Sequence, residues 1–332
     1  MDSEEKKTKE VQEFMRQLVD RVENPLPTSL RSRLRAQKIG DDHGQHDDAT
    51  PEEAKLRDSI EEIMEDVNEK LGKNGDETAW TEVVTPLLEL IIDQRGALFE
   101  TMQVQAVSIS PQSLIPAFVR QPFAFKKVNI AVFLSDSRQE IQRLYVAIQK
   151  RHPLLLLSQS EDATVGHFFQ FAALEVKSPD GSYYGASVQF AIWLAAGLEK
   201  MRQLKDLAGA SSSGGSPADQ LSDPGSHLPL YPGIAVVVQA WYLHLAAKAM
   251  DGTVAIYAPW LIGDTTNRWG IFRIVAALEA LRSWGEAIYY PWLRDHIMMP
   301  LASEMLASDQ WTTATISSSA ASGVVEQEGQ SE

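Results

Sequence analysis

The sequence has no cysteine, no net positive charge and no long apolar run, and each absence excludes a class of protein. Without cysteine, the chain of 332 residues has no disulfide, no thiolate zinc site and no thiol nucleophile. A formal net charge of -15 excludes a surface coated in phosphate-binding lysine and arginine. The most apolar stretch, Ile234 to Ala247, is shorter than the ~20 residues of a membrane span.

Several sequence motifs are also missing. The chain has no Walker phosphate loop, no G-x-G-x-x-G after a strand, no G-x-S-x-G elbow and no H-E-x-x-H. These absences exclude nucleotide-driven motors, dinucleotide dehydrogenases, elbow-type serine hydrolases and zincins. The N-terminal residues include no apolar segment of a secretory signal. We therefore expect a soluble intracellular protein, and leave nucleus and cytoplasm open.

The hydrophobic content of 44% and the eight tryptophans are enough for a sizeable core. Apolar residues recur every three or four positions in 5–22 and 51–71, which predicts two amphipathic helices that dock on the body or on a protein partner. We expect three regions: an N-terminal helical and acidic linker region (1–74), a folded domain (75–306) with a flexible insertion (208–231), and a disordered tail (307–332).

Helices and strands alternate along the folded region, which is typical of an α/β domain. The turn signals Ser178-Pro179-Asp180-Gly181 and Asp251-Gly252 mark two of the strand ends. The predicted helices are 77–99, 183–207, 267–288 and 292–306, and the predicted strands are 103–109, 128–134, 168–177, 234–245 and 253–262.

One window of the acidic chain is basic. Between Arg120 and Arg151, seven basic residues face two acidic ones. Lys126, Lys127 and Arg143 lie in this window, and we expect them to contact nucleic acid if the protein binds it. The alternative is an ordinary solvated face.

A carboxylate and a lysine alternate at the end of a predicted strand. In Leu174-Glu175-Val176-Lys177, the two-residue period places Glu175 and Lys177 on one face, about 7 Å apart. A carboxylate holds Mg²⁺, which acidifies water, while an ammonium orients that water or stabilises charge on a phosphate. The pairing suits metal-assisted hydrolysis of phosphodiesters, and a strand-end ion pair without chemistry is the alternative.

The order of these elements resembles the core of the PD-(D/E)XK nuclease superfamily, and more specifically the fungal proteins with a PD-(D/E)XK nuclease-like domain. The resemblance covers about residues 75 to 290. It implies a restriction-endonuclease-like α/β core, with a central mixed sheet flanked by helices. The motifs that carry it are Glu77-x-x-Trp80, Pro86-Leu87-Leu88, Lys126-Lys127-Val128-Asn129, Glu175-Val176-Lys177, Ala186-x-x-Gln189-x-x-x-Trp193, Pro232-Gly233-Ile234 with Trp241, and Ile262-Gly263-x-Thr265 with Gly270-Ile271.

The resemblance also implies roles for individual residues. Glu175 would be a metal ligand and Lys177 the catalytic lysine, with Mg²⁺ or Mn²⁺ as the ion. Glu77 would assist the metal or its waters, and Gln189 would reach the substrate backbone or orient the site. The residues agree for Gln189, because it lies on a flank of its helix beside the apolar stripe, one turn before Trp193.

Position 129 departs from the family pattern. The family places an aspartate there as the second metal carboxylate, and this chain has Asn129. An amide oxygen coordinates Mg²⁺ without the negative charge that draws a hard cation out of water. Three interpretations stay open: a metal-dependent nuclease that Asn129 attenuates, a degenerate nuclease fold that binds nucleic acid or a protein, and an unrelated α/β domain. Asp136 is the remaining acid near this strand, and its place beyond the strand end makes it a poor substitute.

Overall fold

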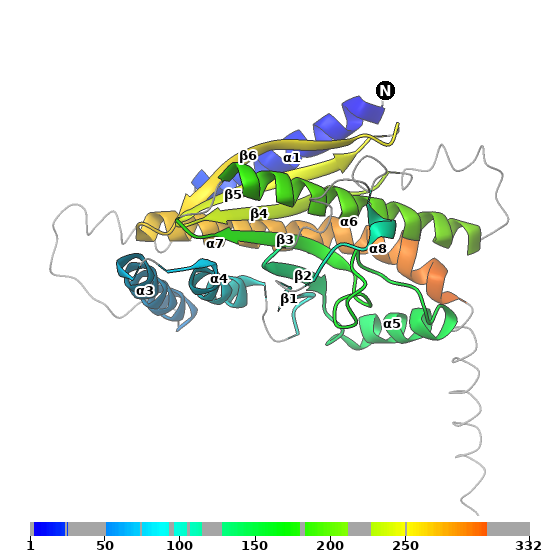
Figure 1. Ribbon diagram of the computed structural model, residues 1–332, viewed down its shortest axis with the longest axis horizontal. Coiled ribbons are helices and arrows are strands. Elements are labelled where there is room, and N and C mark those ends of the chain that lie inside the picture. Colours follow the sequence, from blue (N-terminus) through cyan, green and yellow to red (C-terminus); the bar gives the residue numbers. More distant parts are fainter. Residues whose placement is uncertain are drawn as a thin grey trace, which may run out of the picture.

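A six-stranded mixed sheet forms the centre of the protein, in the strand order β1-β2-β3-β4-β5-β6 (Figure 1). Neighbouring strands are antiparallel except β3 and β4, which are parallel. The strands are β1 (Phe99–Gln103), β2 (Ile130–Leu134), β3 (Gln170–Lys177), β4 (Tyr231–Val237), β5 (Ala240–Lys248) and β6 (Val254–Asp264). The computed structural model describes residues 3–23, 25, 51–73, 75–92, 96–104, 107–114, 128–179, 183–211, 227–249 and 251–303.

Helix α6 (Tyr183–Ser211) joins the two parallel strands and packs on both. Parallel neighbours require such a crossover, because a tight turn cannot return the chain to the same end of the sheet. Lys177, the last residue of β3, is in register with Val237, the last residue of β4. The carboxyl ends of both strands therefore meet at one edge, which is where open α/β sheets bind ligands.

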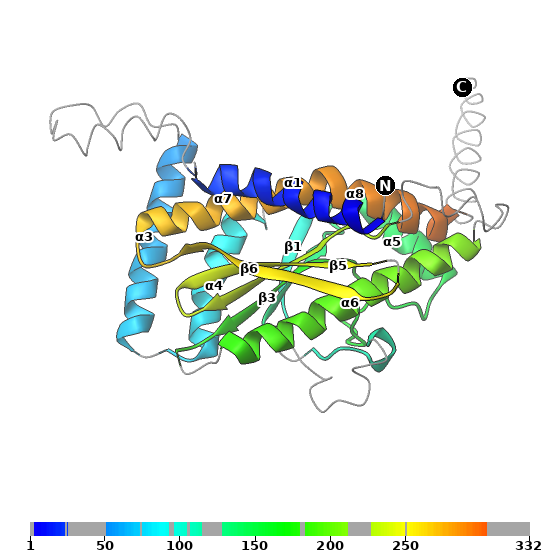
Figure 2. The ribbon, with the colours of Figure 1, turned by 90° about the horizontal axis from the view of Figure 1, so that it is seen from above.

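Helices lie on both sides of the sheet (Figure 2). Helix α6 covers one face, and α7 (Arg268–Trp284) lies on the other, where it packs against β6. Cover on both faces explains why every residue of β2 and nearly every residue of β3 is buried. Beyond α7 the chain stays helical to residue 303, through two π-helical turns, 285–289 and 294–298, and the short α8 (Tyr290–Leu293).

The two N-terminal helices dock on this body. Helix α1 (Ser3–Glu23) packs against α7, and α3 (Pro51–Gly72) packs against α7 and α4 (Glu77–Ile91). An ion pair between Arg268 and Glu61 joins α7 to α3. The apolar stripes of both helices are buried in the common core, with Val11, Phe14, Leu18, Val22, Ile60, Ile63 and Val67.

The predicted fold class, a mixed sheet flanked by helices, is confirmed, although several element boundaries were wrong. The single strand predicted over 234–245 is two strands, β4 and β5, which are joined at Val238 and Gln239. Neither residue type signals a turn, and Val238 adopts a φ of 56°, which a β-branched residue rarely does.

The start of the domain also differs from the prediction. Helix α4 ends at Ile91 instead of residue 99, and the strand expected at 103–109 lies at 99–103. Gly96, at a φ of 75°, separates these two elements. Helix α5 (Gln139–Arg151) was not predicted, because its segment was interpreted only as part of a basic window. Its buried residues recur at helical spacing: Ile141, Leu144, Tyr145 and Ile148.

The predicted break between the last two helices was wrong, since the helical conformation runs through Pro291. Most of the predicted linker and insertion lies outside the described residues, as does the whole tail 307–332. At its start the insertion is shorter than predicted, because α6 extends to Ser211. No helix in the described ranges is long and apolar enough to cross a membrane.

Candidate nuclease site

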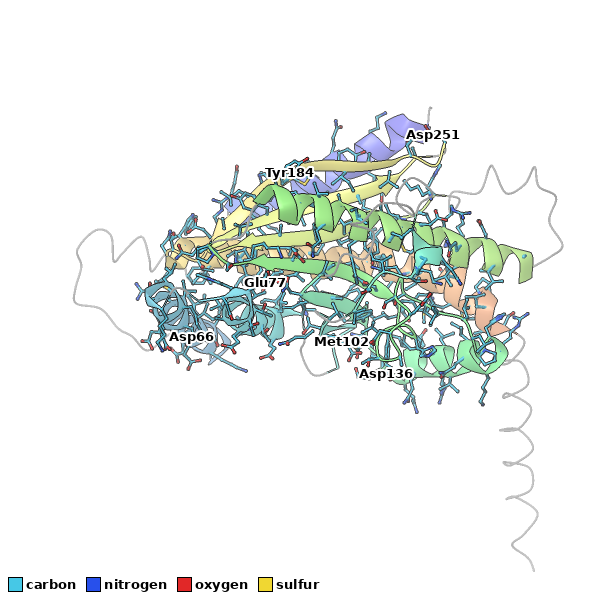
Figure 3. The ribbon with its side chains drawn as sticks, viewed as in Figure 1. Asp66, Glu77, Met102, Asp136, Tyr184 and Asp251 are labelled. Atoms are coloured by element: carbon cyan, nitrogen blue, oxygen red, sulfur yellow. The ribbon has the colours of Figure 1, made fainter. Side chains whose placement is uncertain are left out.

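The first residue of α4 faces the edge of the sheet where β3 ends. Asp76 caps the helix, because its side-chain oxygen accepts a hydrogen bond from the backbone N–H of Ala79 at 2.9 Å. Glu77 follows as the first helical residue (Figure 3). The cap therefore fixes the backbone position from which the Glu77 side chain extends.

Strand pairing brings a second polar residue to the same edge. Asn129 immediately precedes β2, and its backbone N–H donates to the carbonyl oxygen of Leu174 at 3.1 Å. The antiparallel register of β2 with β3 pairs Ile130 with Leu174, so Asn129 lies beside Glu175. Four predicted site residues therefore converge from α4, from β3 and from the position before β2. They are Glu77, Asn129, Glu175 and Lys177.

Lys177 lies between two carboxylates. Its Nζ is 2.6 Å from Oε1 of Glu175, and it donates a hydrogen bond to Oε2 of Glu77 at 2.9 Å. The side chain of Glu175 is 1% exposed, that of Lys177 is 16% exposed and that of Glu77 is 43% exposed. The cluster is therefore deep at Glu175 and opens to solvent at Glu77.

The Asn129 side chain links the two carboxylate-bearing elements. Its Nδ2 donates to Oε1 of Glu77 at 2.9 Å, and its Oδ1 accepts the backbone N–H of Val176 at 2.7 Å. Only the amide oxygen can accept from Val176, so the NH₂ group must face Glu77. In this arrangement Asn129 is a buried bridge between α4 and β3.

The electrostatic surroundings keep Lys177 charged. Burial alone lowers the pKa of the ammonium, but the carboxylates of Glu175 and Glu77 outweigh burial and raise the pKa above its usual value. With both carboxylates ionised, two negative charges and one positive charge leave one net negative charge at the site. That charge favours a further cation only weakly while Lys177 stays in place.

The donor set fits a divalent cation in part. In the portion of the chain that the structure describes, no three Asp, Glu or His side chains gather into a metal site. Glu77 and Glu175 nevertheless reach one common point, which the Lys177 ammonium occupies. Mg²⁺ is commonly held by one or two carboxylates with water and substrate phosphate. These two residues therefore fit the ion when a phosphate completes its coordination.

The turn after β4 supports the same edge. The backbone N–H of Val238 donates to the carbonyl oxygen of Lys177 at 2.9 Å. This contact fixes the end of β3 from the neighbouring strand. Sequence reasoning missed it, as it missed the cap at Asp76; an Asp directly before an apolar helical stripe is a signal that could have revealed the cap.

The remaining predicted site residues come from other segments of the chain. Gln189 lies half-buried on α6, the helix that follows β3, and its role stays a prediction. Lys126 and Lys127 lie outside the described residues. Arg143 is exposed on α5, which follows the far end of β2. Asp136 also follows that far end, so the full length of β2 separates it from Asn129 (Figure 3).

The comparisons with known proteins identify the family of the chain. The family model of the PD-(D/E)XK nuclease superfamily matches residues 28–290, well over half of the chain. Neither a curated protein nor a solved structure matches the chain. Nucleases of this superfamily generally use divalent metals. The convergence of Glu77, Glu175 and Lys177 at the carboxyl end of β3 and the extent of the family match lead to one conclusion: the chain belongs to the PD-(D/E)XK nuclease superfamily.

Proposed function

We propose that this protein hydrolyses phosphodiester bonds of nucleic acid with Mg²⁺ or Mn²⁺, at a rate that Asn129 attenuates. The observation that carries the proposal is the contact of one ammonium with two carboxylates, at 2.6 Å and 2.9 Å, at the carboxyl end of β3. Family membership supplies the class of reaction, and this contact supplies residues able to perform it.

In this proposal the role of each residue depends on its depth in the site. Glu175 and Glu77 would hold the divalent cation, near the neutral side chain of Asn129. When bound, the ion would supply an acidified water molecule and offset charge on the phosphate. Lys177 orients the attacking water and stabilises the negative charge that develops on the phosphate oxygens. Gln189 contacts the substrate backbone, and Arg143, Lys126 and Lys127 bind phosphates away from the scissile bond.

Asn129 lowers the rate in two ways. Its side chain is neutral, so the site lacks the second deep carboxylate charge that the family pattern provides. Its oxygen also accepts the Val176 N–H at 2.7 Å, which leaves one lone pair for any other contact. Two unit charges 4 Å apart are worth about 4 kcal/mol at an effective dielectric near 20, so the missing charge weakens metal binding by orders of magnitude.

A second candidate function is favoured by the same amide. Asn129 and Lys177 both donate to Glu77, and Lys177 also pairs with Glu175, so the ammonium offsets the repulsion between the two carboxylates. A site of this kind suits a nuclease fold that binds nucleic acid or a protein without cutting. This second function predicts salt-sensitive oligonucleotide binding with no cleavage.

A plasmid-nicking assay in Mg²⁺ and in Mn²⁺ separates the two functions. Hydrolysis predicts slow nicking by the wild type, faster nicking by Asn129→Asp, and none by Lys177→Ala. Lys70→Ala is the matched control, because Lys70 also pairs with a carboxylate, Glu82, outside the site. Nicking by Asn129→Asp alone would show a scaffold that has lost its chemistry, and equal nicking by Lys177→Ala and the wild type would contradict catalysis at this site.

A further inference from the structure

The ammonium of Lys177 occupies the point at which a cation would bind. Its Nζ lies 2.6 Å from Oε1 of Glu175 and 2.9 Å from Oε2 of Glu77. These are the contact distances of a charge-assisted pair, and a divalent ion cannot share the point with Nζ. Any metal that binds at this point between Oε1 of Glu175 and Oε2 of Glu77 must therefore displace the ammonium from at least one of these oxygens.

Asn129 is a poor new partner for the displaced ammonium, because its NH₂ group donates to Glu77 and its oxygen accepts from the backbone of β3. Two carboxylates, one ammonium and one divalent ion carry a net charge of +1 beside the nearly dry side chain of Glu175. A phosphodiester, with one negative charge, restores neutrality.

We propose that Lys177 acts as an internal counter-ion that competes with divalent metal for Glu77 and Glu175, so that metal and nucleic-acid phosphate each bind more tightly in the presence of the other. The phosphate accepts the ammonium that the metal releases, and the two ligands strengthen each other's binding equally. This inference rests on the proposed function for the identity of the ligands. It concerns the order of loading, whereas the proposed function concerns the cleavage that follows.

Calorimetric titration with Mn²⁺ tests the competition directly. The titrations use the wild type, Lys177→Met and the control Lys70→Met, each alone and with a short phosphorothioate DNA in single-stranded and duplex form. We expect the DNA to tighten Mn²⁺ binding to the wild type and to Lys70→Met by about tenfold or more. Lys177→Met, which has no competing ammonium, binds Mn²⁺ alone at least about tenfold more tightly than the wild type and gains little from the DNA.

Thermal unfolding guards against a folding artefact. Lys177→Met leaves two carboxylates facing each other, so its melting temperature falls in EDTA and recovers in Mn²⁺. The wild type, whose carboxylates are already paired with Lys177, shows little recovery. A variant that recovers in this way is folded and its affinity is meaningful.

Two results overturn the inference. One is a wild-type affinity for Mn²⁺ alone that equals that of Lys177→Met, and the other is a wild-type affinity that DNA leaves unchanged. Cleavage is scored separately on unmodified DNA. Coupled binding without any cleavage overturns the proposed hydrolysis and supports the competition, whereas cleavage with independent metal binding does the reverse.

Discussion

The side-chain nitrogen of Asn129 lies 2.9 Å from Oε1 of Glu77, so the residue before β2 holds the first residue of α4. The nitrogen donates where an aspartate would present a second negative oxygen. The position at which the resemblance leads us to expect an aspartate is therefore also the position that joins α4 to β3 without metal. This contact makes the effect of a substitution at position 129 depend on metal.

Asn129→Asp is expected to lower stability in EDTA and to regain it in Mn²⁺. The new carboxylate loses the hydrogen bond to Glu77 and repels it, at a cost of about 1 to 2 kcal/mol, given the exposure of Glu77. Thermal unfolding of both proteins in EDTA and in Mn²⁺ measures the change. Asn267→Asp is the control away from the site, because it also replaces an amide that donates to a carboxylate, that of Asp264, while aspartate keeps the cap of α7. An equal melting temperature for Asn129→Asp and the wild type in EDTA would show that the contact with Glu77 contributes little.

His244 predicts a loss of stability in mild acid. It is buried on β5 against the ring of Phe190, and burial lowers the pKa of His244 to about 4. At pH values between about 6.5, the ordinary pKa of histidine, and 4, the imidazole is protonated in the unfolded chain but not in the folded protein. The free energy of unfolding therefore falls as the pH falls through this window. Unfolding of wild type and His244→Leu from pH 7 to pH 4 should show the steeper loss in the wild type.

His167→Gln serves as the control for this experiment, because His167 is only half-buried. It is expected to follow the wild-type pH profile. Parallel profiles for the wild type and His244→Leu would mean that the buried imidazole is protonated as easily in the folded protein as in the unfolded chain.

Gly233→Ala is expected to destabilise the packing of α6 on β4. A Cβ at this position would overlap Cζ of Phe190, a fully buried residue of α6. Overpacking of this kind costs about 1 to 3 kcal/mol in urea unfolding. Gly209→Ala on the same helix meets no atom within 4 Å and should be neutral or stabilising by up to about 1 kcal/mol. A neutral Gly233→Ala would mean that Phe190 repacks freely.

Tyr184 is expected to strengthen the binding of single-stranded nucleic acid. It is 77% exposed at the start of α6, a few residues after Lys177 (Figure 3). An exposed ring stacks on unpaired bases, and alanine substitution at such rings costs about 1 to 3 kcal/mol of binding. Fluorescence anisotropy with a labelled single strand should show weaker binding for Tyr184→Ala and retained binding for Tyr184→Phe. Leu154→Ala, at another exposed apolar side chain, is the control, and equal losses at both positions would argue against stacking.

The site was more predictable from the sequence than the strand boundaries. The alternation of Glu175 and Lys177 follows from strand geometry alone, and the family order of motifs pointed to Glu77 and Asn129. What could not be predicted was the direction of the Asn129 amide. That direction depends on the Val176 N–H, a backbone group whose position is set by the pairing of β2 with β3.

The errors in the fold have local causes. The residue preferences of turns do not favour a tight turn at Val238 and Gln239. The turn forms there because the strands that it joins, β4 and β5, pair with each other. Helix α5 was missed because its segment was interpreted by its charge, although its apolar residues recur at helical spacing. At Val238 and Gln239, strand pairing outweighs the local residue preferences. In α5, the burial of one face shows that the apolar spacing was the correct local signal.

The cluster around Lys177 joins residues that are far apart along the chain: Asn129 is 52 positions after Glu77, and Lys177 is 100 positions after Glu77. Such contacts exist only when the whole sheet and α4 are assembled, and the unfolded chain has no equivalent of them. Every compound that binds the cluster therefore raises the melting temperature of the entire protein by mass action. A thermal-shift screen of cations, oligonucleotides and modified nucleic-acid ends can thus search for the natural ligand whether or not the protein has catalytic activity.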